Sequence, residues 1–240
     1  MALSVAVQNV KALTFDVFGT VVDWRNSIIR QGTEFAQKKG ITVDWEAFAQ
    51  AWRGLYQPKM TLVREGKMPW TNLDALHRMS LEEVLRDFKI SVTPEEFDHI
   101  HTMWHRLDPW PDSVPGLKRL HTKYPLATLS NGNVAMMVNM ARRAGLPWDT
   151  ILGAEVTRHY KPQPECYRIT AQLLGLRTDQ CMLVAAHNGD LVAARAQGFR
   201  TAFIARPTEY GAQQKVDFKA EHDFDIIATS MMDVADQLGC

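Results

Sequence analysis

Cysteine, net charge and long apolar segments are all scarce in this sequence. Its 240 residues include three cysteines, Cys166, Cys181 and Cys240, with no C-x-x-C metal spacing. The 27 lysines and arginines balance 27 aspartates and glutamates, so the formal net charge is zero. No apolar run approaches the roughly 18 residues of a membrane span. We therefore expect free thiols in a reducing cytoplasm, and neither nucleic acid nor a membrane as a partner.

Short apolar runs bounded by turn residues alternate with helical patterns along most of the chain. The runs cover 10–16, 125–130, 181–186, 200–205 and 225–228, and the helical stretches cover 134–144, 164–174 and 191–197. Such runs are typical of buried strands in a parallel sheet. Gly145, Gly175 and Gly198 follow the helical stretches, where helix caps usually lie. The alternation predicts an α/β protein with a doubly wound, mainly parallel sheet.

The segment from about Trp24 to Asp108 shows only helical patterns. One apolar stripe runs from Trp45 to Tyr56, and Thr93 and Glu96 form a capping box. We predict a core domain of residues 1–22 and 109–240, with a helical cap domain, 23–108, inserted after the first strand. Ligands of such sheets bind at the carboxyl ends of strands, so an insert there covers the site and can act as a lid.

Polar side chains follow the predicted strands at the points where they end. Asp16 closes the first strand in F-D-V-F-G-T, Ser130 and Asn131 close the second, and Asp190 follows the third. Lys161 lies in a loop before a helix. Gly19 permits a tight turn, in which the N–H groups of residues 17–19 form a candidate anion nest. We expect these groups to converge on one polar site.

The order F-D-x-x-G-T, S-N-G, Y-K-P and then G-D resembles the haloacid dehalogenase superfamily over nearly the whole chain. The resemblance implies a Rossmannoid core with a helical cap. Most members are magnesium phosphatases with a second aspartate where Phe18 stands and another acidic residue where Ala185-Ala186-His187 stands. Magnesium needs hard oxygen ligands, and a phosphate dianion beside Asp16 and Asp190 without a metal is disfavoured. We therefore expect no metal and no cofactor.

The sequence is more similar to the L-2-haloacid dehalogenase branch, also called type II. That branch carries an apolar residue at the position of Phe18, a cap arginine matched by Arg53 and a tyrosine matched by Tyr167. The resemblance implies that Asp16 displaces halide from C2 and that water hydrolyses the aspartyl ester. An L-2-haloacid would then give a D-2-hydroxyacid. Haloacetates, including fluoroacetate, are further expected substrates, and the family suggests a homodimer.

The same resemblance assigns the other site residues. Lys161 would keep Asp16 ionised, and Thr20 would brace the loop. Ser130 and the N–H groups of Val17 and Phe18 would hold the substrate carboxylate, while Asn131 and Arg53 would face the departing halide.

Activation of water has two explanations at this stage. Related dehalogenases often have asparagine where this chain has His187, and a neutral imidazole could take a proton from water near pH 7. Alternatively, His187 only shapes the pocket while Asp190 holds Lys161.

Two other functions stay open. A phosphatase or phosphonate hydrolase would be stimulated by magnesium, and a non-catalytic binding protein with this fold would have lost Asp16 or Lys161. His101 and His105 have a zinc-compatible spacing but no evident third ligand. Arg206 and Tyr210 have no role that the sequence reveals.

Overall fold

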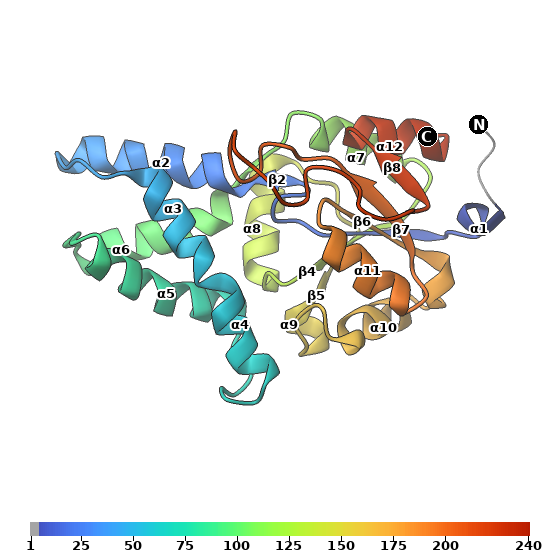
Figure 1. The fold of residues 1–240 in the computed structure, drawn as a ribbon, viewed down its shortest axis with the longest axis horizontal. Coiled ribbons are helices and arrows are strands. Elements are labelled where there is room, and N and C mark those ends of the chain that lie inside the picture. Colours follow the sequence, from blue (N-terminus) through green and yellow to red (C-terminus); the bar gives the residue numbers. More distant parts are fainter. Residues whose placement is uncertain (1–4) are drawn as a thin grey trace.

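The centre of the molecule is a six-stranded parallel sheet in the order β5-β4-β1-β6-β7-β8 (Figure 1). The computed structural model describes residues 5–240. Because β4 and β5 lie on one side of β1 and β6 to β8 on the other, the chain reverses direction across the sheet at β1. The strands are β1 (Ala12–Phe15), β4 (Leu126–Ser130), β5 (Thr150–Gly153), β6 (Cys181–Ala185), β7 (Arg200–Ile204) and β8 (Ile226–Ala228).

Helices cover both faces of this sheet, because consecutive side chains of a buried strand point to opposite faces. In β6, Leu183 and Ala185 pack with helices α10 and α11, while Met182 and Val184 belong to the cluster that includes α7, α8 and α12. The core helices are α1 (Val5–Gln8), α7 (Ser113–His121), α8 (Val134–Ala144), α9 (Ala154–Thr157), α10 (Pro164–Leu173), η2 (Thr178–Gln180), α11 (Asn188–Ala196) and α12 (Met231–Leu238).

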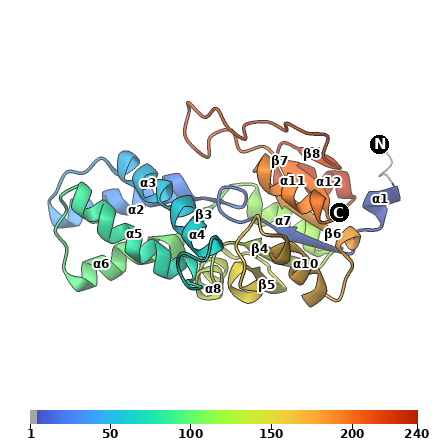
Figure 2. The same cartoon turned by 60° about the horizontal axis from the view of Figure 1, so that its bottom comes forward.

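The insert after β1 forms a helical lobe beside the sheet (Figures 1 and 2). It consists of α2 (Trp24–Lys39), α3 (Trp45–Gly54), α4 (Tyr56–Arg64), α5 (Leu73–Asp87), α6 (Pro94–His101) and η1 (Thr102–Arg106). The chain enters and leaves the lobe through a two-strand antiparallel ribbon of β2 (Val22–Asp23) and β3 (Asp108–Pro109). The division into a core of 1–22 and 109–240 and a cap of 23–108 stays a prediction, which the position of this ribbon supports.

Local sequence explains where the lobe helices begin. The side chains of Asp23, Asp44 and Asn72 accept hydrogen bonds from backbone N–H groups in the first turns of α2, α3 and α5. The capping box of Thr93 and Glu96 is present at α6, as the sequence predicts.

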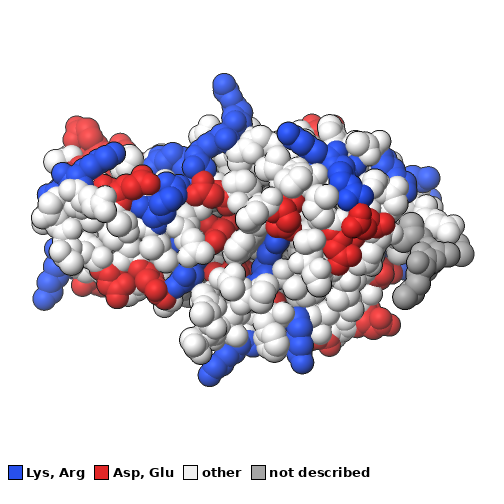
Figure 3. All heavy atoms as spheres, turned by 90° about the horizontal axis from the view of Figure 1, so that it is seen from above, with Lys and Arg blue, Asp and Glu red and all other residues white. Residues whose placement is uncertain are grey.

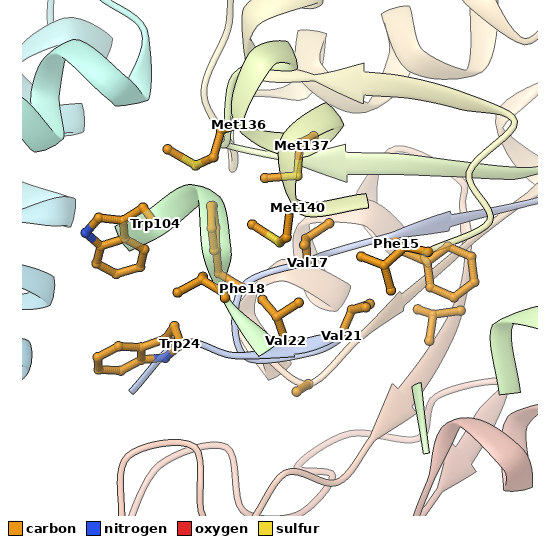
Figure 4. Packing of buried hydrophobic residues seen from close by; sticks show 14 of the residues in the cluster. Phe15, Val17, Phe18, Val21, Val22, Trp24, Trp104, Met136, Met137 and Met140 are labelled. Carbon is orange, nitrogen blue, oxygen red and sulfur yellow. The ribbon is translucent and has the colours of Figure 1, made fainter. Parts of the chain in front are cut away.

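The lobe and one face of the sheet share a single buried hydrophobic cluster. Phe18, from the loop after β1, contacts the ring of Trp104 edge-on with centroids 5.8 Å apart. Trp104 in turn stacks on Trp24 at 6.1 Å. Figure 4 shows these rings beside the methionines of α8, at the junction of the two regions. The lobe is therefore anchored by packing as well as by the ribbon.

Three sequence predictions were wrong in detail. Strand β5 (Thr150–Gly153) was not predicted, because only Ile151 and Leu152 in it are large and apolar. The stripe from Trp45 to Tyr56 belongs to two helices, since α3 ends at Gly54 and α4 begins at Tyr56. Helix α11 begins at Asn188 rather than at 191, so Asp190 lies in its first turn.

The surface is consistent with the balanced composition. Basic and acidic side chains are mixed on the face shown in Figure 3, without a large area of one sign. Within residues 5–240, no helix has the length and apolar character needed to cross a membrane.

Candidate active site

Asp16 is the first residue after β1, at the point where the chain order reverses across the sheet. Crevices at such points are the usual ligand sites of doubly wound sheets. Asp16 is only 6% exposed, and its Oδ2 accepts a hydrogen bond from the Thr20 hydroxyl at 2.7 Å. The Thr20 Oγ1 also accepts the Ala186 N–H at 2.9 Å, so Thr20 braces the loop against the end of β6.

Lys161 joins two carboxylates on one side of the site. Its Nζ donates to Asp16 Oδ1 at 2.9 Å and also contacts Asp190 Oδ2. The other oxygen of Asp190, Oδ1, accepts the Tyr167 hydroxyl at 2.7 Å. Asp190 therefore holds the ammonium that faces Asp16.

His187 joins two carboxylates on the other side. Its Nδ1 lies 3.0 Å from Asp16 Oδ2, and its Nε2 lies 2.9 Å from Oε2 of Glu209. Glu209 is 1% exposed and also accepts the indole N–H of Trp24 at 3.0 Å. The row of charges thus continues from Asp190 through Lys161, Asp16 and His187 to Glu209.

These contacts shift the pKa values of Asp16, His187 and Lys161. Burial acts to raise the pKa of Asp16, but the Lys161 ammonium and the His187 hydrogen bond hold it well below its usual range. Burial acts to lower the pKa of His187, but Glu209 and Asp16 raise it well above its ordinary value. The pKa of Lys161 is likewise raised by Asp16 and Asp190 against the effect of burial. These shifts favour an ionised Asp16 and a protonated His187 in the free protein.

A cavity of about 510 Å³ lies in front of Asp16. The sheet domain supplies the floor, including Phe18, Asn131 and Tyr210, and the helical lobe supplies the opposite wall. The lobe residues at that wall are Arg53, Tyr56, Gln57 and Arg64. A second cavity of about 470 Å³ adjoins it, with Trp24, Arg53 and Tyr210 among its lining residues.

Arg53 is one of two cations of the lobe wall, with Arg64, and it is partly buried. Its guanidinium lies 3.9 Å from the ring centroid of Tyr56 and 5.5 Å from that of Trp24. Its Nε is shielded from solvent without a hydrogen-bond partner, and no carboxylate among residues 5–240 forms an ion pair with it. A cation held by aromatic faces and lacking a counter-ion is suited to an anionic ligand.

The other predicted binding groups differ in how they are engaged. Asn131 lines the cavity and its Oδ1 accepts the Lys161 N–H at 2.9 Å. Ser130 is fully buried behind it, and its Oγ accepts the Gly132 N–H at 3.1 Å.

The predicted anion nest is smaller than expected. The Gly19 N–H donates to the Val22 carbonyl at 2.9 Å and is therefore not available to a ligand. No hydrogen bond within the described part of the chain uses the N–H groups of Val17 or Phe18.

The surroundings of Asp16 do not fit the magnesium ion that most members of the superfamily use. Both carboxylate oxygens already accept hydrogen bonds, and two of the three donors are the cations Lys161 and His187. Across residues 5–240, no group of three or more His, Cys, Asp or Glu side chains is arranged to hold a metal. His101 and His105 instead both contact Asp74.

Sequence reasoning missed Glu209 and Arg64, and it gave Arg206 and Tyr210 no role. Arg206 donates to the Thr20 carbonyl at 2.9 Å and to Asp112 at 2.8 Å, so it ties the 206–211 loop to the nucleophile loop. Arg64 reaches from the lobe to the Lys161 carbonyl at 2.8 Å. No motif marks these residues, because each acts from a loop or helix surface whose position depends on the tertiary fold.

A buried carboxylate at the switch point of a parallel sheet, facing a helical lobe inserted after its strand, defines a haloacid dehalogenase-like hydrolase. The chain belongs to this family, whose sequence profile matches residues 10–198. Within it, the chain is 47% identical to the L-2-haloacid dehalogenase PA0810, with a TM-score of 0.94 and coverage of 96% of this chain and 99% of that one. The predicted family and fold class are thus confirmed.

Two further relatives belong to the same branch. The defluorinating L-2-haloacid dehalogenase Rha0230 is 45% identical, with a TM-score of 0.96 and coverage of 100% of this chain and 99% of that one. The curated (S)-2-haloacid dehalogenase 4A of Burkholderia cepacia is 27% identical over 85% of this chain and 88% of its own length.

Proposed function

We propose that the protein hydrolyses short L-2-haloalkanoic acids to D-2-hydroxyacids and halide. The observation that carries this proposal is the pairing of ionised Asp16 with an uncompensated Arg53 across one cavity. A 2-haloacid monoanion needs a nucleophile for C2 and a cation for the charge that the halide takes away. The similarity to L-2-haloacid dehalogenases at 45–47% identity supports the same reaction.

In the first step an oxygen of Asp16 attacks C2 from behind the carbon–halogen bond. Oδ1 accepts one hydrogen bond, from Lys161, whereas Oδ2 accepts two, from Thr20 and His187. We assign the attack to Oδ1, since it keeps more lone-pair density free. The new Oδ1–C2 bond replaces the carbon–halogen bond, and halide leaves with the electron pair. Because the attack inverts C2, an L substrate gives a D product.

In the second step water adds to the carboxyl carbon of the aspartyl ester. Ester formation removes the charge of Asp16, and with it one of the two carboxylates that hold the proton of His187. The imidazolium can then release this proton to solvent, and neutral Nδ1 accepts one from the attacking water.

The Cγ–Oδ1 bond then breaks. The departing oxygen faces the Lys161 ammonium and recovers a proton from His187, so the product carries Oδ1 and Asp16 carries the oxygen of water. Asp16 returns its proton to His187, and the cycle releases one proton for each halide.

The groups proposed to bind substrate are two unengaged N–H groups, two side chains that already accept hydrogen bonds and the Arg53 guanidinium. We infer that the N–H groups of Val17 and Phe18, with the Ser130 hydroxyl, hold the substrate carboxylate. Asn131 and Arg53 face the halide, while Phe18, Tyr56 and Tyr167 line the path of the substrate. Fixed donors beside aromatic walls favour displacement because they replace part of the hydration of the nucleophile.

We include fluoroacetate in the proposed substrate range. The relative Rha0230 is described as defluorinating, and a fluoride leaving group depends most on a cation and hydrogen-bond donors facing it. Arg53 supplies the cation here.

The direct test is halide release from L- and D-2-chloropropionate, bromoacetate and fluoroacetate, measured by ion chromatography in EDTA, with Asp16→Asn as the control. Of the two chloropropionates, only the L isomer should release halide, and Asp16→Asn should release none. A single turnover in H₂¹⁸O with excess enzyme should place the label in the peptide that contains Asp16 before it reaches product. If no substrate releases halide and the protein hydrolyses phosphate esters with magnesium, the alternative function as a phosphatase replaces this proposal.

Assembly as a homodimer and a cytoplasmic location are further proposals. The three cysteines are free thiols, which supports the proposed reducing compartment. Burial raises the pKa of Cys166 to about 12, so this thiol is unreactive. Light scattering of the purified protein tests the dimer.

A further inference from the structure

Glu209 is a buried carboxylate beside the nucleophile that the reaction described above does not yet use. Its oxygens lie 2.9 and 3.2 Å from Nε2 of His187, and Oε1 also accepts the Trp24 indole N–H at 3.0 Å. Its ion pair with His187 is its only one among residues 5–240. An almost fully buried carboxylate with a single titratable partner is costly for stability, which makes a purely structural role a weak explanation.

The chain holds Glu209 against the nucleophile loop from two directions. Gly19 has a φ of +82°, and a Cβ at this position would come within 2.1 Å of Glu209 Oε1. Glycine is therefore needed both for the turn and for the space that the carboxylate occupies. From the other side, the Glu209 N–H donates to the carbonyl of Arg206, whose guanidinium is bonded to the Thr20 carbonyl.

We propose that Glu209 is a positioning residue for hydrolysis of the aspartyl ester. By accepting the Nε2–H of His187, it leaves Nδ1 as the ring nitrogen that takes the proton of water next to Asp16. This inference rests on the proposed function and deepens it, because it separates ester formation, which needs no base, from ester hydrolysis, which does.

The charges around His187 are consistent with this role. Asp16 faces Nδ1 from the end of β1, and Glu209 faces Nε2 from the 206–211 loop. The other charged groups at the same cavity are Arg53 and Arg64 from the lobe, Lys161 and Asp190 across Asp16, and Asp217. Only Asp16 loses its charge during the reaction, so Glu209 is the carboxylate that still holds His187 once the ester has formed.

Trp24 makes the choice of variant informative. In Glu209→Gln, the indole N–H of Trp24 selects the amide oxygen for the Oε1 position, where it is 3.0 Å away. The amide NH₂ then occupies the Oε2 position and donates to Nε2 of His187. Because the NH₂ at 2.9 Å is nearer to Nε2 than the oxygen at 3.2 Å, we expect the imidazole proton on Nδ1, which is the wrong tautomer for a base beside Asp16. An amide in place of the orienting carboxylate of a nucleophile–histidine pair is known to cost orders of magnitude in rate for this reason.

The expected kinetic result is a burst. Glu209→Gln should release about one halide per site at nearly the wild-type rate, after which turnover falls by about 10²-fold or more. Intact-mass measurement should show the accumulated ester. Removing the indole donor in Trp24→Phe/Glu209→Gln lets the amide turn its oxygen toward Nε2, and should restore at least tenfold of the hydrolysis rate. Trp24→Phe alone is the reference for the double variant, and Glu221→Gln, on an exposed loop, is the control for a remote charge change.

A second measurement does not depend on turnover. With ¹⁵N-labelled histidine, NMR of the free wild-type protein should show His187 doubly protonated at pH 7, and in Glu209→Gln neutral with the proton on Nδ1. Equal slowing of halide burst and hydrolysis, absence of trapped ester, or an unchanged His187 tautomer would overturn the positioning role. If the wild type releases no halide although the NMR difference is present, the proposed function fails and the catalytic role of Glu209 fails with it.

Discussion

The two walls of the cavity treat charge in opposite ways. On the sheet side every charged group has a partner within hydrogen-bond distance, from Asp190 through Lys161, Asp16 and His187 to Glu209. On the lobe side Arg53 contacts aromatic faces and forms no ion pair with a carboxylate of residues 5–240. Charges that are mutually paired are fixed in place before substrate arrives, whereas an unpaired cation gains its partner only from the ligand. We therefore expect the sheet side to carry out the reaction and the lobe side to recognise the substrate.

The largest effect is expected where the nucleophile itself is removed. Asp16→Asn keeps the size of the side chain but cannot displace halide, so multiple-turnover halide release should fall by about 10⁴-fold or more. Circular dichroism should show an unchanged fold. Retention of even a few per cent of wild-type activity would mean that another group attacks C2.

The second effect tests pairing on the sheet side. Lys161→Met removes the cation shared by Asp16 and Asp190, both largely buried. The two carboxylates then repel each other and the pKa of Asp16 rises. The free energy of unfolding, measured by urea denaturation, should fall by about 3–5 kcal/mol. Halide release should fall by about 10³-fold at pH 7. Full stability in this variant would show that the row of charges does not contribute to the fold.

Arg53→Met is the matched change on the lobe side. Among residues 5–240 no carboxylate forms an ion pair with Arg53, so none loses its partner in this variant. The free energy of unfolding should therefore change by no more than about 1 kcal/mol. Without a cation for the substrate and the departing halide, kcat/KM should still fall by about 10²-fold. A loss of stability as large as that of Lys161→Met would erase the contrast between the two walls.

The smallest expected effect is on the pH dependence of the free energy of unfolding. The pKa of His187 is raised in the folded protein by Glu209 and Asp16, against the effect of burial. Such a group stabilises the fold fully below its unfolded pKa of about 6.5, and this contribution is lost as pH rises through the folded pKa. From pH 7 to 9, wild-type stability in urea should therefore decrease more steeply than that of His187→Gln. Parallel slopes would indicate that His187 is neutral in the folded protein.

Sequence reasoning placed a residue at the site where its position is encoded by its neighbours in the chain. Asp16 follows a buried strand, and Lys161 precedes a helix within Y-K-P, so their motifs identified them and the family was confirmed. Arg53 was found only through the resemblance, because its helix shows an ordinary apolar stripe. Glu209 was out of reach, since its partner His187 is 22 residues away and the contact depends on how the 206–211 loop folds back. The pKa shift of His187 depends on the same contact and could not be predicted from the sequence either.

The shared hydrophobic cluster has a consequence for how the molecule unfolds. Phe18, Trp24 and Trp104 link the nucleophile loop to the lobe by direct ring contact, so neither part can lose its packing without exposing the other. The lobe is thus thermodynamically coupled to the sheet, and the two regions should melt in one cooperative transition, although the chain enters and leaves the lobe through a ribbon of only a few residues. We therefore expect the inserted helical lobe and the sheet to unfold together as one cooperative unit.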